Sequence, residues 1–300
     1  MCNTLITGSA GFIGSHLYKY LKDEEYKVVG IDNFSHPCNQ AVPVKHCDVR
    51  YYKDILPYFS QCDIVFHLAA QISVDKSIYN PEETIATNII GTQNILEAAR
   101  KFKTKVVFAS TSEIYGSSLT GLMNEAHPLN PQSPYGASKL AADRMCYAYY
   151  KTYGLDVVIV RNFNTFGEYQ ADDSYGGVIA KFTKAALKGG PLNIYGDGRQ
   201  QRDYMHISDA LQAYDKAMTL PAGSVVNFGS GSTIDINALA RSIIEITGSK
   251  SKIIHVEPRK GEVQRLCADI TLAKQYGFKP QTDFNKNLED YIKWMQTIKE

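Results

Sequence analysis

Short apolar runs alternate with longer amphipathic stretches through most of the chain. The apolar runs, rich in β-branched residues, predict strands at residues 4–7, 28–31, 44–47, 64–68, 106–109, 157–160 and 225–228. Helical patterns occupy residues 12–24, 81–101 and 134–153, and Gly154 is suited to end the last of these helices. Strands that alternate with helices predict a parallel sheet covered on both faces.

A glycine-rich turn follows the first expected strand. Gly8, Gly11 and Gly14 have the spacing G-x-x-G-x-x-G, and Asp32 stands 18 residues further on, where the second strand ends. Such glycines allow a tight turn and a close approach to a pyrophosphate, and the following helix offers its N-terminal amides to the phosphates. Asp32 would accept hydrogen bonds from ribose hydroxyls and repel a 2′-phosphate. The pattern predicts an NAD site rather than an NADP site.

These patterns together predict an α/β fold with a Rossmann-like doubly wound parallel sheet and a smaller, interleaved C-terminal substrate-binding domain. Glycine-rich breaks near Gly167 and at residues 189–190 and 196–198 mark where the chain leaves the sheet. We expect residues 1–166 and 203–230 to form the NAD-binding domain. Residues 167–202 and 231–300 would form the domain that binds the substrate.

Tyr135 and Lys139 are candidate catalytic residues. Their spacing places them one turn apart on the same face of the expected helix. An ammonium beside a phenol favours the phenolate, so we expect Lys139 to lower the pKa of Tyr135 toward a value useful for deprotonating an alcohol. The triplet Thr111-Ser112-Glu113 lies upstream and adds a hydroxyl and a carboxyl group.

Composition excludes several other classes of protein. The formal net charge of +1 argues against a basic nucleic-acid-binding surface. Six scattered cysteines without a C-x-x-C pair indicate a reducing, cytoplasmic location and predict neither disulfides nor a metal site. No apolar run approaches the length of a membrane span, and the N-terminus enters a strand directly, so we expect no signal peptide and no membrane partner.

The chain resembles the extended short-chain dehydrogenases/reductases of the NAD-dependent nucleotide-sugar epimerase/dehydratase family. The resemblance runs nearly end to end and covers several ordered motifs. These motifs are at residues 8–14, 48–49, 67–70, 88–92, 111–116, 133–139, 161–164, 195–198, 201–204 and 259–262, together with Asp32.

The resemblance implies specific roles for individual residues. The catalytic residues would be Thr111, Glu113, Tyr135 and Lys139. The cofactor-binding residues would be Gly8, Gly11, Phe12, Ile13, Gly14, Asp32, Asn33, Asp48, Val49, Leu68, Ala69, Ala70, Asn88, Tyr135 and Lys139. The substrate-binding residues would be Ser112, Asn164, Arg202 and Arg259. Within these sets, Asp48 and Val49 would lie against the adenine, Asn88 beside the nicotinamide, and the arginines against the nucleotide diphosphate.

The family resemblance leaves the net reaction open. After oxidation at C4 of the sugar, a dehydratase would use Glu113 as the base that removes the C5 proton, and this is our leading hypothesis. A UDP-hexose 4-epimerase and a UDP-glucuronate-type decarboxylase are the alternatives, and Ser112 stands where many dehydratases have an acid. Residues 130–139 and 258–262 are more similar to the epimerases. A reductase that releases NADH and a non-catalytic NAD-sensing protein are two further alternatives.

Substrate and assembly are also expectations from the resemblance. UDP, GDP and dTDP sugars all suit the motifs, with a UDP-sugar favoured. The sugar would be selected by residues such as Ile72, Ser73, Asn162, Tyr169 and Tyr175. Helices at 81–101 and 134–153 would pair across a homodimer as a four-helix bundle.

Overall fold

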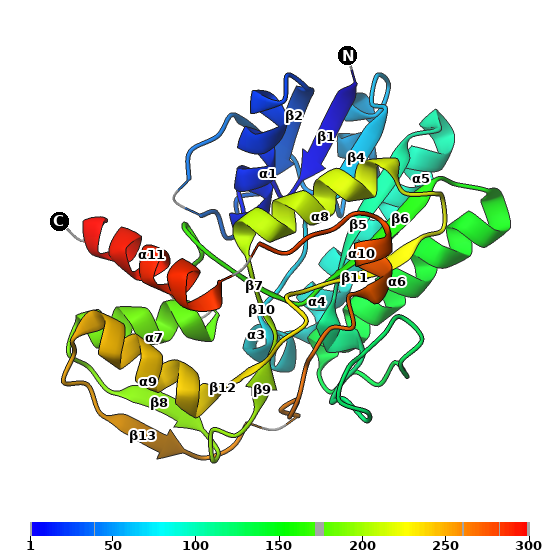
Figure 1. Cartoon of the computed structure of the whole chain (residues 1–300). Coiled ribbons are helices and arrows are strands. Elements are labelled where there is room, and N and C mark those ends of the chain that lie inside the picture. The colour runs from blue at the N-terminus through cyan, green and yellow to red at the C-terminus, as the bar shows by residue number, and fades with distance from the viewer. Residues whose placement is uncertain (1, 39, 172–176, 260, 282, 299–300) are drawn as a thin grey trace.

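Seven parallel strands form the central sheet of the chain in its computed structural model, which describes residues 2–38, 40–171, 177–259, 261–281 and 283–298 (Figure 1). They are β1 (Asn3–Thr7), β2 (Lys27–Asp32), β3 (Val44–His46), β4 (Ile64–His67), β5 (Lys105–Thr111), β6 (Val157–Asn162) and β11 (Val225–Phe228). Their order is β11-β6-β5-β4-β1-β2-β3. The direction of winding reverses between β1 and β4, and this reversal opens a crevice at the carboxyl ends of these two strands. The Rossmann-like fold predicted from the sequence is confirmed.

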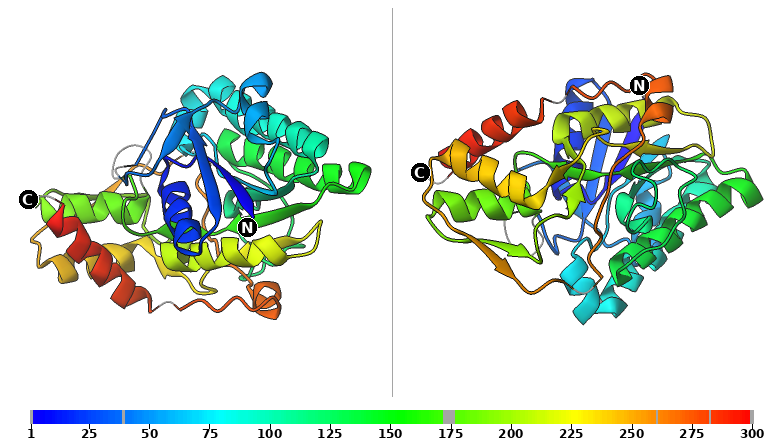
Figure 2. Two further views of the ribbon diagram at one scale, coloured as in Figure 1. Left: turned by 90° about the horizontal axis from the view of Figure 1, so that it is seen from above. Right: turned by 60° about the horizontal axis from the view of Figure 1, so that its bottom comes forward.

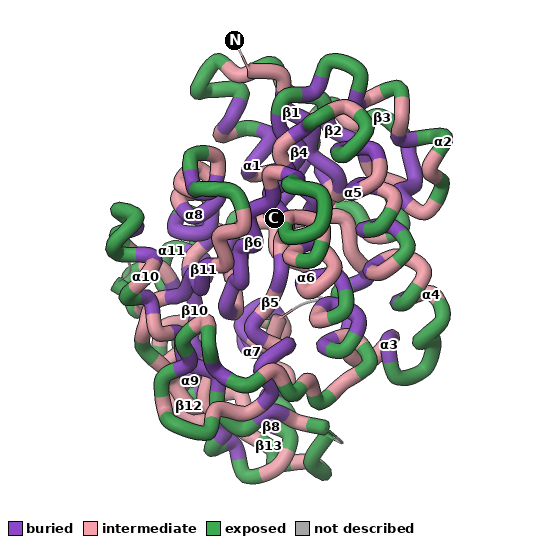
Figure 3. Tube along the Cα trace, turned by 90° about the vertical axis from the view of Figure 1, so that its right-hand side faces the viewer, coloured by how far each residue is buried: buried purple, intermediate pink, exposed green. Residues whose placement is uncertain are grey.

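Helices cover both faces of the sheet. One face carries α1 (Phe12–Asp23) and α8 (Ile207–Thr219), and the other carries α2 (Tyr52–Ile55), α5 (Gly91–Phe102) and α6 (Pro134–Tyr153). Neighbouring strand residues point to opposite faces. Ile6 and Phe66 pack toward α1 and α8, whereas Leu5 and Val65 pack toward α5 and α6. Because both faces are buried at the centre of the sheet, strands such as β4 and β6 are near-continuous buried runs, and Figure 3 shows them inside the molecule.

The helix expected at residues 81–101 has an irregular middle. It consists of α4 (Pro81–Ile85), a π-helical stretch η2 (Ala86–Ile90) and α5. The wider turn lies beside the segment after β3, where a Cβ atom on Gly91 would lie 2.8 Å from Val49 Cγ2. It carries Asn88 into the interior, where 1% of this residue is exposed. Isolated π-helical turns are often found at functional sites.

A smaller lobe packs beside the carboxyl edge of the sheet (Figure 2). It is built from α7 (Val178–Leu187), β8 (Leu192–Tyr195), α9 (Ile236–Thr247), β13 (Ile253–Val256) and α11 (Phe284–Thr297). Strands β8 and β13 pair in parallel, and Phe182, Leu239 and Tyr291 belong to a separate apolar core. Two short strand pairs lie between the lobes. They join β7 (Asn164–Phe166) to β10 (Tyr204–His206) and β9 (Gln201–Arg202) to β12 (Ile234–Asp235).

The chain returns to the larger lobe after β13. Val263, Leu266 and Phe278 belong to the same apolar core as α1 and α8, and α10 (Thr271–Gln275) packs against β11. Residues 263–278 therefore lie with the sheet, although the sequence placed all of 231–300 in the substrate-binding domain. Their apolar side chains complete a core whose other members are distant in sequence, so no local pattern indicated this packing.

A buried ion pair holds α6 against the sheet. Arg161 on β6 is 1% exposed, and its Nε and Nη2 donate to the Asp143 carboxylate on α6 at 3.0 and 3.1 Å. Ser110 on β5 donates to the same carboxylate at 2.7 Å. Arg161 Nη1 donates to the Tyr115 hydroxyl at 2.7 Å. The carboxylate and the guanidinium are thus both paired, which a buried charge requires.

We predict that Asp143→Ala destabilises the protein by about 3–5 kcal/mol, because it leaves the Arg161 guanidinium buried without its partner. Urea unfolding at pH 7 measures this loss. Arg144→Ala is the matched control, since it removes the half-exposed partner of the same carboxylate and should cost less than about 1 kcal/mol. Equal losses for the two variants would contradict this account.

Candidate active site

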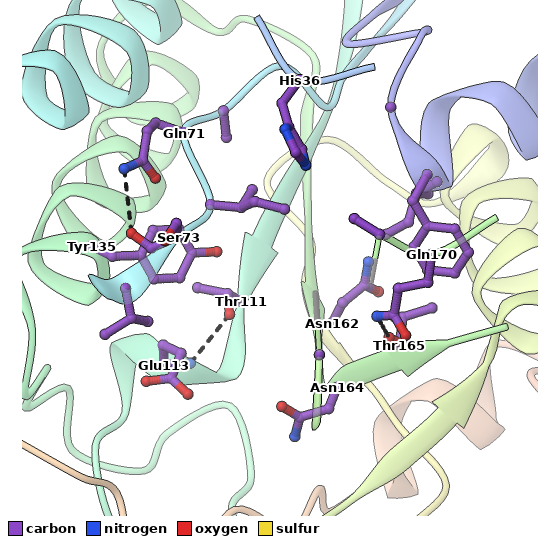
Figure 4. A pocket seen from close by; sticks show the side chains of 18 of the residues that line it. His36, Gln71, Ser73, Thr111, Glu113, Tyr135, Asn162, Asn164, Thr165 and Gln170 are labelled. Atoms are coloured by element: carbon purple, nitrogen blue, oxygen red, sulfur yellow. Dashed lines mark hydrogen bonds between the residues drawn. The ribbon is translucent and has the colours of Figure 1, made fainter. Parts of the chain in front are cut away.

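A cavity of about 860 Å³ begins where β1 and β4 end and continues toward the smaller lobe. Figure 4 shows Gln71, Tyr135, Thr111 and Glu113 on one side of it and Asn162, Asn164 and Gln170 on the other. Most residues selected from the sequence line this one cavity. They are Gly8, Gly11, Phe12, Ile13, Gly14, Asp32, Asn33, Val49, Leu68, Ala69, Ala70, Thr111, Ser112, Glu113, Tyr135, Lys139, Asn164, Arg202 and Arg259.

Two glycines of the turn after β1 lie at positions where no other residue fits. Gly8 has φ +73°, and a Cβ atom there would lie 2.7 Å from the Ala69 nitrogen. A Cβ atom on Gly14 would lie 2.1 Å from the Gly8 oxygen. The turn therefore places the N-terminus of α1 at the cavity wall with its amides uncovered by side chains, which is the arrangement that binds a pyrophosphate.

Asp32 closes the end of β2 beside this turn. Its carboxylate accepts hydrogen bonds from the Ala10 amide at 3.0 Å and from the Phe34 amide at 2.7 Å. Burial raises its pKa, and these amide hydrogen bonds oppose the rise. The carboxylate lines the cavity, fixed where ribose hydroxyls would reach it.

Asp48 does not line the cavity, although the resemblance placed it against the adenine. Its carboxylate accepts from Asn33 Nδ2 at 3.1 Å and from Arg50 Nε at 3.0 Å. Burial acts to raise its pKa, but the hydrogen bonds from Arg50 outweigh it and hold the pKa below the usual value. Asp48 thus contacts Asn33 and Arg50, both of which line the cavity, and its place against the adenine stays a prediction.

His67 organises the loop that follows β4. Its Nδ1 is 2.8 Å from the Thr7 hydroxyl, and that hydroxyl accepts from the Ala69 amide at 3.2 Å. On the other side, His67 Nε2 is 3.1 Å from the Thr92 hydroxyl, which donates to the Asn88 carbonyl at 2.7 Å. Burial lowers the pKa of His67 to about 3, with Lys139 adding to the effect. A neutral ring with the proton on Nε2 satisfies every donor and acceptor in this chain of hydrogen bonds.

Asn88 also does not line the cavity. Its Oδ1 accepts from the Gln71 amide at 2.8 Å, and its Nδ2 donates to the Gln71 carbonyl at 3.0 Å and to Ser138 Oγ at 2.9 Å. The resemblance expected this side chain beside the nicotinamide. Because the oxygen and the nitrogen of its amide are both engaged within the protein, Asn88 instead links the loop after β4 to α6.

Tyr135 and Lys139 lie one turn apart at the start of α6 and face the cavity. Lys139 Nζ donates to the Ala109 carbonyl at 2.6 Å and lies 4.3 Å from the Phe108 ring centre. Burial lowers the pKa of Lys139 to about 8. Burial raises the pKa of Tyr135 above 10, with Glu113 adding to the rise and a hydrogen bond to Thr111 opposing it. The sequence prediction that this pKa is lowered is therefore wrong, because desolvation of the phenol outweighs the hydrogen bond to Thr111.

Glu113 lies in η3 (Ser112–Ile114), directly after β5. Its amide donates to the Thr111 hydroxyl at 3.3 Å, and its carboxyl group lies at the cavity near Thr111 (Figure 4). Burial raises the pKa of this carboxyl, the Arg202 cation opposes the rise, and Glu262 adds to it. A carboxyl group with a raised pKa is a stronger base when ionised and is suited to moving a proton near neutral pH.

The candidate phosphate-binding residues come from the lobe boundary. Arg202 Nη2 lies 3.9 Å from Glu262 Oε1, and Asn164 Nδ2 donates to the Asp203 carbonyl at 3.1 Å. Arg259 stacks 4.0 Å above the Tyr195 ring centre.

Arg259 also reaches across to the larger lobe. Its Nη2 lies 3.7 Å from Asp75 Oδ2 on α3 (Val74–Tyr79). This ion pair therefore joins the two lobes at the cavity wall, and both side chains are partly exposed.

The structure adds residues to the cavity that the sequence did not single out, among them Gln71, Gln170 and Tyr214. Gln71 follows the 67–70 motif directly, which was a usable signal, whereas the other two are brought in by tertiary packing. Of the residues expected to select the sugar, Ile72, Ser73 and Asn162 line the cavity. Tyr169 packs 5.1 Å from the Trp294 ring instead, and Tyr175 lies outside the described residues.

The model of the NAD dependent epimerase/dehydratase family matches residues 4–229. The chain belongs to this family. It is 36% identical to a putative UDP-glucose 4-epimerase of Methanocaldococcus jannaschii, over 97% of this chain and 98% of that protein. It is also 36% identical to a UDP-N-acetyl-alpha-D-glucosaminuronate decarboxylase of Bacillus cytotoxicus, over 98% of both chains. The structure of a UDP-glucose 4-epimerase of Thermotoga maritima with UDP-glucose has a TM-score of 0.96 at 32% identity, covering 99% of this chain and all of that one.

NAD is the cofactor of this epimerase/dehydratase family member. The cavity is suited to it, because the Gly8–Gly14 turn leaves the α1 amides bare and Asp32 is ready to accept from a ribose. When bound, NAD supplies a reversible two-electron oxidation. Among the described residues, no cluster of side chains could hold a metal ion, and no helix is long and apolar enough to cross a membrane.

We predict that Lys139→Met changes how the stability of the protein depends on pH. The pKa of Lys139 is near 8 in the folded protein, below its ordinary 10.5, so between these values the unfolded chain binds more protons and wild-type stability rises with pH. Below pH 8 the buried ammonium costs up to about 3 kcal/mol, which methionine avoids. Lys139→Met should therefore gain stability over wild type at pH 7, and the gain should shrink between pH 8 and 10.5.

Thermal unfolding across this pH range measures the effect. Lys151→Met on the same helix is the control, because this exposed ammonium stays in water when the protein folds. A stability difference for Lys139→Met that does not vary with pH would contradict the prediction.

Proposed function

We propose that this family member oxidises C4 of a nucleotide sugar transiently, with a UDP-sugar as substrate. The observation that carries the proposal is the convergence of Thr111, Tyr135 and Lys139 on the cavity that also holds the glycine turn and Asp32. A protein that only sensed NAD would not need these three groups beside an open space for a second ligand. A reductase that released NADH would not need the diphosphate-binding residues of the smaller lobe.

Tyr135 is the base for the first step. As a phenolate it takes the proton of the sugar 4-hydroxyl, and Thr111 holds that hydroxyl in place. The pKa of Tyr135 is raised although Lys139 lies one turn away on α6, so the phenolate needs a further positive charge beside it. The oxidised nicotinamide of NAD would bring such a charge, and Tyr135 would then deprotonate the substrate only in the assembled complex.

Glu113 supports water elimination as the net reaction. The 4-keto group formed in the first step acidifies the C5 proton, and the Glu113 carboxylate would remove it and pass a proton to the 6-hydroxyl, which leaves as water. The pair of electrons from the C5–H bond forms a C5=C6 double bond. The hydride taken from C4 would then return to C6, with a proton added at C5, so that the oxidation is reversed within the cycle. The partial burial of Glu113 at the cavity and its raised pKa suit this role. We therefore propose a dehydratase as the leading candidate.

A 4-epimerase is the second candidate. It needs no base beyond Tyr135, only rotation of the keto sugar so that the hydrogen returns to the other face of C4. The likeness to the Thermotoga maritima UDP-glucose 4-epimerase, at a TM-score of 0.96, favours this reaction.

The smaller lobe would bind the nucleotide diphosphate. Arg202 and Arg259 each present a guanidinium at the cavity, and the planar fork of arginine pairs with two phosphate oxygens. In this proposal residues 167–202 and parts of 231–300 form the substrate-binding domain, and Arg259 exchanges its contact with Asp75 for a phosphate.

Product mass decides among the reactions. The NAD-loaded protein is incubated with UDP-glucose, UDP-N-acetylglucosamine, UDP-glucuronate, GDP-mannose and dTDP-glucose. Loss of water indicates the dehydratase, and loss of carbon dioxide indicates a decarboxylase. An unchanged mass with inverted stereochemistry at C4 indicates the epimerase. No conversion of any of these sugars would overturn the proposed function.

We predict that Tyr135→Phe lowers kcat by about 10²–10⁴, because general base catalysis contributes that much. Glu113→Gln should lower dehydration by a similar factor while leaving oxidation at C4 intact, measured as formation of the reduced cofactor on the enzyme. Glu289→Gln is the matched control, since Glu289 is exposed on α11. Full dehydratase turnover by Glu113→Gln would rule out Glu113 as the base that removes the C5 proton.

We also propose a homodimer formed through η2, α5 and α6. Ile85 and Ile90 are 49% and 43% exposed. The neighbouring helices α5 and α6 are joined to each other by a hydrogen bond of 2.6 Å from the Tyr149 hydroxyl to Glu97. Ile90→Glu would place a charge in this contact and is expected to give monomers by light scattering after size exclusion. Ile298→Glu, at an exposed position beyond α11, is the control that should remain dimeric. A monomeric wild-type protein would contradict the proposal.

A further inference from the structure

Gln71 is held in a fixed relation to the catalytic helix. Both its backbone amide and its carbonyl are bonded to the Asn88 side chain, at 2.8 and 3.0 Å. The same Asn88 amide donates to Ser138, which lies between Tyr135 and Lys139 on α6 and donates to the Tyr135 carbonyl at 2.7 Å. The position of Gln71 relative to the catalytic tyrosine is therefore set by hydrogen bonds and not by loop packing alone.

The Gln71 side chain has one polar atom without a partner. The residue is 5% exposed and lines the cavity, beside Tyr135 in Figure 4. Its Nε2 donates to the Ser73 carbonyl at 3.3 Å. Because a carbonyl can only accept, this bond fixes which end of the amide is the nitrogen. Its Oε1 is buried and has no hydrogen-bond partner among the residues that the structure describes.

Such an atom is costly in a folded protein unless a ligand or water pairs it. Nothing about the backbone requires a glutamine here, since the hydrogen bonds from Asn88 go to main-chain atoms and would form with any side chain. The orphan acceptor therefore points to a bound molecule that brings a donor.

We propose that Gln71 Oε1 accepts a hydrogen bond from a neutral O–H or N–H donor of a ligand bound in the cavity. Two sources offer this chemistry beside Tyr135: a hydroxyl of the substrate sugar, which rests on the proposed function, and the carboxamide of the nicotinamide, which does not. In either case Gln71 is a binding residue that orients its ligand relative to the Tyr135 phenol. Because Oε1 and a carboxylate are both acceptors, Gln71 also disfavours binding of a ligand that has a carboxylate on the part facing Oε1.

Isothermal titration tests the proposal with Gln71→Met, which keeps the length of the side chain and removes both polar atoms. NAD is titrated into the unliganded protein, and UDP-glucose and UDP are each titrated into the NAD-loaded protein. Loss of one hydrogen bond is expected to weaken binding of one ligand roughly 2- to 10-fold. Weaker NAD binding identifies the carboxamide, and weaker UDP-glucose binding with unchanged NAD and UDP binding identifies a sugar hydroxyl.

Two further variants separate binding from folding. Thr183→Val removes another buried hydroxyl without a partner, on α7 and outside the cavity lining, and should change no affinity. Gln71→Glu keeps an oxygen acceptor and should recover part of the affinity that Gln71→Met loses. A structural role limited to the Ser73 contact would lower the melting temperature of Gln71→Met and leave every affinity unchanged.

Unchanged affinities for NAD and UDP-glucose in Gln71→Met overturn the proposal, whether or not the melting temperature moves. An equal loss of affinity for UDP also overturns it, because UDP has neither the hydroxyls of the substrate sugar nor the carboxamide of the nicotinamide. Failure of the parent protein to bind UDP-glucose is a separate result that counts against the proposed substrate, and the NAD titration then decides the role of Gln71 by itself.

Discussion

The buried pair of Asp143 and Arg161 is the interaction on which the catalytic half of the site depends. Tyr135, Lys139 and Asp143 follow one another at intervals of four residues on one face of α6. The hydrogen bonds from Arg161 on β6 to the Asp143 carboxylate therefore also fix the positions of Tyr135 and Lys139. Ser110 ties the same carboxylate to β5, the strand that ends at Thr111. One fully paired charge cluster thereby ties Tyr135, the proposed general base, to the strand that ends at Thr111, the residue proposed to hold the substrate hydroxyl.

The cofactor half depends on a different constraint, the close approach of the turn after β1 to the loop after β4. The Gly8 position leaves no room for a side chain beside Ala69, and the hydrogen bonds centred on His67 hold that loop in register. Asn88 then connects the loop to α6. The loop after β4 and the start of α6 are therefore parts of one hydrogen-bonded framework, whereas Arg259 of the smaller lobe meets Asp75 in a partly exposed ion pair.

Burial sets the resting charge state of the site. It raises the pKa values of Tyr135 and Glu113 and lowers that of Lys139, so the cavity opposes charge on all three groups. Near neutral pH the shifts of Lys139 and Glu113 carry a cost in stability that apolar residues would avoid, whereas that of Tyr135 carries a cost only above the ordinary pKa of tyrosine. The same groups become effective once bound charges and hydroxyls replace the lost water, which is the general reason that functional sites are locally less stable than they need to be.

The sequence by itself determined the alternation of strands and helices along the chain, the glycine turn, Asp32 and the spacing of Tyr135 and Lys139. Each of these depends on local spacing or on a backbone conformation open to few residues. Tertiary structure alone decided the inward turn of Asn88, the return of residues 263–278 to the larger lobe, the upward shift of the Tyr135 pKa and the unpaired Gln71 oxygen. These features arise from contacts between segments far apart in the chain and from the exclusion of water by those contacts. The period and spacing of neighbouring residues encode neither the contacts nor the loss of water.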